Sequence, residues 1–276
     1  MSPAGTPVRE ALDSAVIALT AAGVDTPRLD AEVLLAHALG VDRAALITDG
    51  ERAVQGPAVR AFQSSVRRRS VEREPVAYIT GIKGFRHLDL HVDRRVLVPR
   101  PETETLVEAA LEALPNGARV VDVGTGSGAV ALALKDERPD LEVIATDVSE
   151  DAIAVARANA QRLGLAVEFV LADLLAGLSD VGAVVSNPPY VEDGAQLAPE
   201  IVRHEPALAL RAGPEGLDVL ARLVPAAAAR GAEVLAVEVG AGQARAVEAL
   251  ARNAGFARSE RRADLAGVDR VVVARR

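Results

Sequence analysis

The stretch that decides the fold reads VVDVGTGSGAVALAL and covers residues 120–134. A short apolar strand leads into Gly124, Gly126 and Gly128, and a helix rich in alanine and leucine follows. Alternating glycines let a ligand approach the backbone where side chains would obstruct it, and the free N–H groups at the start of the helix act as donors. The stretch therefore predicts a cofactor turn. Taken alone, the stretch also satisfies the looser dinucleotide-binding pattern G-x-G-x-x-G/A. The alternative that the turn has a purely structural role also stays open.

Strands and helices alternate from this stretch to the end of the chain. Short apolar runs separated by helical stretches are typical of a parallel sheet covered on both faces. We therefore predict an α/β fold. The predicted strands are Arg119–Val123, Val143–Asp147, Val167–Leu171, Ala183–Ser186, Val234–Val239 and Asp269–Ala274.

The first 75 residues have the pattern of short helices. Thr6-Pro7 and Thr26-Pro27 each place a hydroxyl N-cap before a proline at the first helical position. Gly23 and Gly40 fall where helix C-caps are expected. This part of the chain therefore predicts a small helical domain.

Two further helices are expected near 42–48 and 57–73. The second carries the run Arg67-Arg68-Arg69. A run of like charges on a helix is most simply a solvated face, and we interpret this one in that way.

The period changes after residue 75. Leu88, Leu90 and Val92 alternate with polar residues, which is typical of a strand or a hairpin. We expect residues 76–98 to form a bridge between two domains.

The composition excludes several classes of protein. The chain has 276 residues, of which 50% are apolar and 25% charged, as in an ordinary globular protein. It has no cysteine, which excludes a disulfide framework, a zinc ribbon, a thiolate-held iron-sulfur cluster and a cysteine nucleophile. No segment has the pattern of a signal peptide or of a membrane span, so we expect a cytoplasmic protein.

Charge is divided unevenly along the chain. Residues 1–100 carry 14 basic and 12 acidic residues, whereas the remainder carries 17 basic and 27 acidic ones. An acidic body suits a cationic ligand better than a polyphosphate backbone. The six aromatic residues could stack few bases. His87 and His91 could share one strand face, but without a third ligand nearby we predict no metal site.

Three carboxylates lie at or just beyond the carboxyl ends of the first three strands of the predicted sheet. Asp122 would repel a pyrophosphate but suits the amino group and sulfonium of S-adenosylmethionine. Asp147 follows the first glycine by 23 residues, close to the spacing of an acid that accepts both ribose hydroxyls. Asp173 could accept from an adenine amino group or act as a helix N-cap.

The sequence Asn187-Pro188-Pro189-Tyr190 follows the fourth strand. The prolines keep Asn187 extended, fix the turn and remove N–H donors, so that carbonyl acceptors remain. A planar NH₂ group could donate to the Asn187 side-chain oxygen and to the Pro188 carbonyl, while Tyr190 stacks on its plane. The turn therefore predicts a site that orients a planar nitrogen.

These motifs together resemble the HemK/PrmC family, the release factor glutamine methyltransferases. Asn187–Tyr190 and Asp122–Gly128 are similar to the motifs of class I methyltransferases that modify planar nitrogens. The resemblance covers nearly the whole chain. Its other segments are Glu74–Gly81, Val98–Glu104, Leu197–Glu200, His204–Pro206, Gly213–Leu217, Glu238–Gly240 and Leu265–Arg270.

The family resemblance implies a class I S-adenosylmethionine-dependent methyltransferase with a Rossmann-like, seven-stranded sheet whose last strand is antiparallel. We expect a helical substrate-docking domain over 1–75, a β-hairpin linker over 76–98 and the methyltransferase domain over 99–276. The implied reaction is N5-methylation of the glutamine side-chain amide in the Gly-Gly-Gln motif of class I peptide-chain release factors. S-adenosyl-L-methionine is the expected cofactor, S-adenosyl-L-homocysteine the product, and the release factor the partner of a monomeric enzyme.

Three residues depart from the family pattern. Leu174 stands where some relatives carry an aromatic beside the adenine, and His87 and His204 also differ from the commoner residues.

The expected site residues fall into three groups. The expected catalytic residues are Asn187, Pro188 and Tyr190. The expected cofactor-binding residues are Asp122, Gly124, Thr125, Gly126, Ser127, Gly128, Asp147, Asp173, Leu174 and Asn187. The expected substrate-binding residues are Asn187, Pro188, Pro189, Tyr190, Arg100, Glu102 and Thr103.

Other functions stay open at this point. A nucleic-acid base methyltransferase, acting on adenine N6 or guanine N2, would present the same planar NH₂ to the turn; the net charge and the scarce aromatics disfavour it. A nicotinamide-dependent oxidoreductase would use the same glycine turn, but Asp122 and the Asn187 turn disfavour that function. A noncatalytic cofactor-binding module is the third alternative.

Overall fold

The computed structural model describes residues 5–48 and 50–276, which divide into two units. The first unit comprises the chain up to Gly81 together with Leu197–His204, and the second comprises Ile82–Gln196 and Glu205–Arg276. No helix in the described part of the chain is long and apolar enough to cross a membrane.

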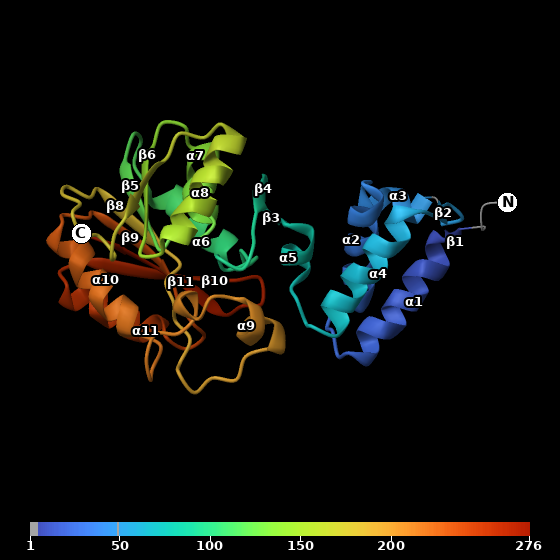
Figure 1. Cartoon of the computed structure of the whole chain (residues 1–276). Helices are drawn as coiled ribbons and strands as arrows, with labels where there is room; N and C mark the ends of the chain where they lie inside the picture. Colours follow the sequence, from blue (N-terminus) through green and yellow to red (C-terminus); the bar gives the residue numbers. More distant parts are fainter. Residues whose placement is uncertain (1–4, 49) are drawn as a thin grey trace. The chain divides into compact units, whose positions relative to one another are not determined.

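The first unit is helical. Its apolar core, which includes Leu19, Leu34, Leu35 and Phe62, is formed by the inner faces of the helices. Its elements are β1 (Thr6–Pro7), α1 (Val8–Ala21), α2 (Pro27–Leu39), α3 (Arg43–Thr48), β2 (Ala53–Val54), α4 (Pro57–Ser70), α5 (Val76–Thr80) and α9 (Pro199–His204) (Figure 1).

Helix ends in this unit follow the sequence signals in part, and the C-cap of α1 is Ala22 instead of the expected Gly23. Thr26 is the N-cap residue of α2, with proline at the first helical position, but its hydroxyl donates to Asp30 at 2.8 Å instead of capping the helix backbone. Gly40 is the left-handed C-cap of α2. Helix α1, however, begins at Val8 after Pro7, so the expected N-cap role of Thr6 is wrong. Thr6 instead pairs with Val54 in a short antiparallel bridge, which removes it from the capping position.

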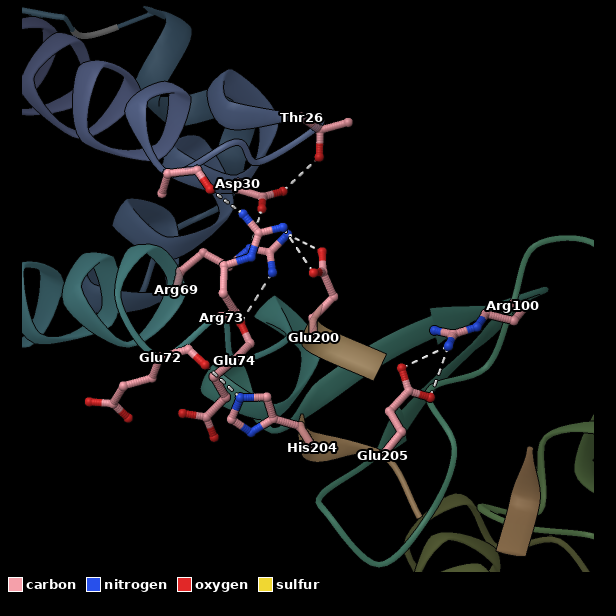
Figure 2. A network of polar contacts seen from close by, with 11 residues as sticks. Thr26, Asp30, Arg69, Glu72, Arg73, Glu74, Arg100, Glu200, His204 and Glu205 are labelled. Atoms are coloured by element: carbon pink, nitrogen blue, oxygen red, sulfur yellow. Dashed lines mark hydrogen bonds and ion pairs between the residues drawn. The ribbon is translucent and has the colours of Figure 1, made fainter. Parts of the chain in front are cut away.

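The arginine run of α4 is not a solvated face at Arg69. The Arg69 side chain is only 9% exposed, and its guanidinium donates to Asp30 at 2.7 Å and to Glu200 of α9 at 3.4 Å. Arg73 donates to the other oxygen of Glu200 at 2.9 Å (Figure 2). The expectation from the charge pattern was wrong because it could not show the buried carboxylates that these guanidinium groups meet.

The second unit contains a seven-stranded sheet with the order β10-β11-β9-β8-β5-β6-β7, in which only the last strand of the chain, β11, runs antiparallel to its neighbours. This confirms the α/β fold. Its strands are β5 (Arg119–Val123), β6 (Glu142–Asp147), β7 (Glu168–Leu171), β8 (Ala183–Ser186), β9 (Val234–Glu238), β10 (Arg258–Ala263) and β11 (Asp269–Arg275). A separate hairpin of β3 (Ile82–Phe85) and β4 (Leu88–His91) precedes it.

Helices cover both faces of the sheet (Figure 1). On one face, α6 packs on β9 and β11, α7 on β5 and β6, and α8 on β6 and β7. The other face forms an apolar core with α10 and α11 that includes Val121, Val184, Leu235 and Val247. The helices are α6 (Thr103–Ala113), α7 (Ala129–Glu137), α8 (Glu150–Leu163), α10 (Asp218–Ala229) and α11 (Ala244–Asn253), with a short 3-10 helix at Ala207–Ala209.

Strand register brings the expected site residues to one edge. Val123 of β5 pairs with Thr146 of β6, and Asp147 pairs with Leu171 of β7, so the carboxyl ends of these strands are level. Ligands of open α/β sheets bind at this edge, where the strand order reverses.

Candidate active site

A cavity of about 330 Å³ lies at the carboxyl ends of β5, β6, β7 and β8. Most of its wall is apolar, and a few polar groups converge on it. This is the usual character of a small-molecule site. Of the residues expected from the sequence, the wall contains Gly124, Gly126, Asp147, Asp173, Leu174, Asn187, Pro188 and Pro189.

The glycine turn after β5 has a backbone that side chains would not allow. Gly124, Gly126 and Gly128 all have positive φ, at 73°, 56° and 86°, which L residues rarely adopt. A Cβ at Gly128 would lie 3.0 Å from the Leu132 side chain and 3.2 Å from Ala156, so α7 and α8 approach closely there. The turn therefore leaves open backbone on the cavity side.

Asp147 presents a fixed carboxylate to the cavity. Oδ2 accepts from the Gly126 amide at 2.9 Å, and Oδ1 accepts from the Ser149 amide at 2.9 Å. A carboxylate has about four acceptor positions, so two backbone bonds leave room for two ligand hydroxyls. This fits the acceptor that a ribose requires.

Asp122 lies behind the cavity wall. It is only 1% exposed, and its Oδ2 accepts from the Thr125 hydroxyl at 2.7 Å and from the Ala131 amide at 3.1 Å. Burial raises the pKa of Asp122 to about 7, although these two bonds counteract the rise. Asp122 thus braces the glycine turn from inside, and its contact with a cofactor stays a prediction.

The side chains of the other turn residues lie in the interior of the unit, and their contact with a cofactor stays a prediction. Thr125 and Ser127 are buried and do not line the cavity. The Ser127 carbonyl accepts from Asn159 of α8 at 3.0 Å, and the same Asn159 side chain bonds both the amide and the carbonyl of His91. Asn159 therefore ties the hairpin to the glycine turn.

Asp173 and Leu174 follow β7 on the cavity wall. A turn follows them rather than a helix, so the N-cap alternative for Asp173 is wrong. The Thr146 hydroxyl donates to the Leu174 carbonyl at 2.9 Å and fixes the turn. Asp173 forms an ion pair with Arg222 of α10, which also lines the cavity and which the sequence did not single out.

Asn187 is held in one orientation at the end of β8. Its Nδ2 donates to the Thr103 hydroxyl of α6 at 2.9 Å, which leaves the side-chain oxygen as an acceptor at the cavity wall. Pro188 and Pro189 continue this wall and contribute carbonyl acceptors without N–H donors. The arrangement matches the acceptor turn that the sequence predicts.

Tyr190 is anchored from two sides and does not line the cavity. Its hydroxyl donates to Glu238 at 3.0 Å, and its carbonyl accepts from Gln243 at 3.0 Å. Burial and the charge of Glu238 raise its pKa well above the usual range, so the phenol stays protonated. A Cβ at Gly216 would lie 2.2 Å from the Tyr190 carbonyl, so this approach needs glycine.

The three residues expected to line a substrate groove are also away from the cavity wall. Thr103 is buried and bonds Asn187. Arg100 donates to both carboxylate oxygens of Glu205, at 2.7 and 2.9 Å (Figure 2). Glu102 is exposed at the start of α6. Contact of these residues with a substrate stays a prediction.

Sequence reasoning missed Glu238 and Gln243. Glu238 is fully buried at the end of β9, and a carboxylate that ends an apolar strand is the signal that also marked Asp122 and Asp147. Gln243 had no such signal, because its contacts with Tyr190, Glu215 and Gly216 all cross long sequence distances.

The sheet order, the glycine turn, the acid that ends β6 and the amide turn after β8 define a class I methyltransferase fold. The cavity could hold an adenosyl cofactor, because the turn presents Gly124 and Gly126, which have no side chains, and Asp147 has acceptor positions to spare.

Comparisons with known proteins agree with this class and narrow it. The family model described as PrmC N-terminal domain matches residues 10–81, and the one described as Methyltransferase small domain matches residues 102–254. The chain is 47% identical over 227 residues to a release factor glutamine methyltransferase of Deinococcus radiodurans, covering 80% of this chain and 81% of that protein. It is 44% identical over 228 residues to one of Mycolicibacterium smegmatis, covering 81% and 80%.

Among solved structures, the E. cuniculi complex responsible for methylation of the eRF1 translation termination factor has a TM-score of 0.50 at 23% identity. The matched region covers 66% of this chain and 99% of the chain in that structure. This likeness shows the fold. On the sequence relatives, the chain belongs to the release factor glutamine methyltransferase family.

Proposed function

We propose that the protein transfers a methyl group from S-adenosylmethionine to the N5 side-chain nitrogen of the glutamine in the Gly-Gly-Gln motif of class I peptide-chain release factors. The observation that carries this proposal is the fixed amide of Asn187. The Thr103 hydroxyl accepts a hydrogen bond from the NH₂ group of Asn187. The Asn187 side-chain oxygen and the Pro188 carbonyl therefore remain as two acceptors for a planar NH₂ group of the substrate. The names of the relatives support the substrate.

The main contribution of the protein to this reaction is to orient the amide nitrogen. An amide nitrogen is a poor nucleophile because its lone pair is delocalised, and the bound cofactor supplies an electrophilic methyl group. Holding the nitrogen in line with that methyl lowers the barrier by up to about 7–11 kcal/mol. Positive charge grows on the nitrogen during transfer, so the bonds that Asn187 and Pro188 accept strengthen in the transition state. S-adenosylhomocysteine is the leaving group, and the methylated nitrogen gives up one proton to water.

The remaining residues bind and orient. We infer that Asp147 accepts the ribose hydroxyls and that Asp173 and Leu174 hold the adenine. Tyr190, protonated and bonded to Glu238, accepts no proton, and its stacking on the substrate amide stays a prediction. The helical first unit would dock the release factor, because a protein substrate needs contact area beyond one glutamine. This activity belongs in the cytoplasm, where release factors act, and a monomer suffices for it.

Labelled S-adenosylmethionine tests the proposal. The protein is incubated in parallel with a class I release factor, with the same factor carrying alanine for the motif glutamine, with tRNA and with DNA. Peptide mapping should place one methyl group on the motif glutamine of the first sample alone. Label in nucleic acid and none in the release factor would favour the base methyltransferase instead.

A further inference from the structure

A buried carboxylate outside the cavity contacts the amide turn. Glu238 at the end of β9 is fully buried, and its Oε1 accepts from the Tyr190 hydroxyl at 3.0 Å. Burying a carboxylate is costly unless charge or hydrogen bonds compensate. A core position between apolar strands is therefore an expensive place for a carboxylate without a function.

The second link runs through Thr103. This buried threonine at the start of α6 accepts from Asn187 at 2.9 Å, so its own proton is still to be donated. Burial raises the pKa of Glu238, and the Thr103 and Tyr190 hydroxyls together with the charge of Arg270 counteract the rise. Thr103 therefore accepts from the Asn187 amide and is also a hydroxyl donor in the surroundings of the Glu238 carboxylate.

The carboxylate is not saturated by these groups. Among residues 5–48 and 50–276, the buried Oε2 atom has no hydrogen-bond partner. A buried acceptor without a partner is costly, because the loss of its bonds to water is uncompensated. A nearby hydroxyl whose hydrogen is uncommitted therefore gains by donating to it. The Thr103 hydroxyl, whose oxygen already receives the Asn187 amide, has such a proton.

We propose that Glu238 is a positioning residue for methyl transfer, which fixes Tyr190 directly and Asn187 through Thr103. The inference rests on the proposed function, because it concerns how the amide acceptor of that reaction is aimed. Glu238 touches neither the cavity nor the reacting atoms. Its effect is to select one rotamer of the Asn187 amide, with the NH₂ toward Thr103 and the oxygen toward the cavity.

Single-turnover kinetics with saturating cofactor and release factor test this role. Glu238→Ala should lower the methyl-transfer rate about 10- to 100-fold while the calorimetric affinity for S-adenosylmethionine changes less than about twofold. Glu238→Gln keeps an acceptor for Tyr190 and should recover the rate to within a few-fold of the parent. Thr103→Val removes the acceptor of the Asn187 amide and should slow transfer, whereas Thr103→Ser should not.

Coupling distinguishes positioning from simple destabilisation. Glu238→Ala combined with Thr103→Val should lose much less than the product of the two single losses, because both act on Asn187. Val237→Ala is the matched control: it removes a fully buried side chain of the same strand that belongs to the core facing α10 and α11, and should lower the melting temperature without slowing transfer.

Several results would overturn the inference. These are an unchanged rate in Glu238→Ala, a Gln variant as slow as the Ala variant, fully multiplicative losses with Thr103→Val, or an equal slowing by Val237→Ala. If Glu238→Ala does not fold, the Thr103→Val and Thr103→Ser pair decides, and equal rates for the two refute it. A parent protein that fails to methylate the release factor refutes the proposed function instead.

Discussion

Removing the Glu200 carboxylate should destabilise the helical unit by about 2–3 kcal/mol. Glu200 of α9 binds Arg73 at 2.9 Å and Arg69 at 3.4 Å, and all three side chains are at most 15% exposed (Figure 2). Breaking a buried ion pair costs about 3–5 kcal/mol because a buried charge is left behind. Arg69 keeps Asp30 and Arg73 keeps the Ala22 carbonyl, which reduces the expected loss.

Urea denaturation of Glu200→Gln against the parent measures this loss without adding ions that screen charge. The matched control is Glu51→Gln, which breaks the pair with Arg9 in the same unit, where the side chains are 61% and 69% exposed. That exposed pair should contribute no more than about 0.5 kcal/mol. A Glu200→Gln loss as small as that of Glu51→Gln would refute the reasoning.

The pH dependence of this loss has a definite sign. Burial alone would raise the pKa of Glu200, but its backbone hydrogen bond, Arg73 and Arg69 outweigh that effect and hold the pKa below its usual range. The unfolded chain therefore binds a proton on Glu200 at higher pH than the folded chain does. The stabilisation is complete above the usual glutamate pKa and is lost as pH falls through the lowered one, so parent and variant should converge in acid.

Three further predictions concern the cavity wall and the buried Asp122 behind it. Asn187→Ala should bind the cofactor normally and transfer methyl about 100-fold more slowly, while Asn187→Asp, which keeps an acceptor, should be intermediate in single-turnover assays; a parental rate for the alanine variant would mean the turn is structural. Asp147→Ala should weaken calorimetric binding of S-adenosylmethionine by about 1–3 kcal/mol, and an unchanged affinity would contradict the ribose contact. Between about pH 4 and 7, folded Asp122 keeps a proton that the same residue has lost in the unfolded chain. Urea midpoints should therefore show the parent losing stability relative to Asp122→Asn between pH 5 and pH 8. Parallel pH profiles of the two proteins would argue against this.

Most of the sheet could be predicted because its strands are apolar and buried. The six predicted strands agree with the observed ones to within one residue at each end. Strand β10 (Arg258–Ala263) was missed from the residue pattern, since it reads RSERRA and lies at the sheet edge. Charged edge strands avoid pairing with other chains, and this removes the apolar pattern by which strands are identified.

Site residues at strand ends could be predicted, whereas those held by contacts distant in sequence could not. Residues that end or follow a strand, such as Asp147 and Asn187, could be placed because parallel strands end at one edge. The roles of Thr103, Glu238 and Gln243 could not be derived, because each depends on a partner 48 to 84 residues away along the chain. Periodicity and local spacing carry no information about such contacts.

The helical unit is discontinuous in sequence, and this affects the order in which the chain can fold on the ribosome. Its last element, Leu197–His204, is synthesised after strands β5 to β8 of the other unit. Until then Arg69 and Arg73 lack the carboxylate of Glu200. Domains usually fold in the order of their synthesis, but here the N-terminal unit emerges first and reaches its final stability only after much of the sheet has been made.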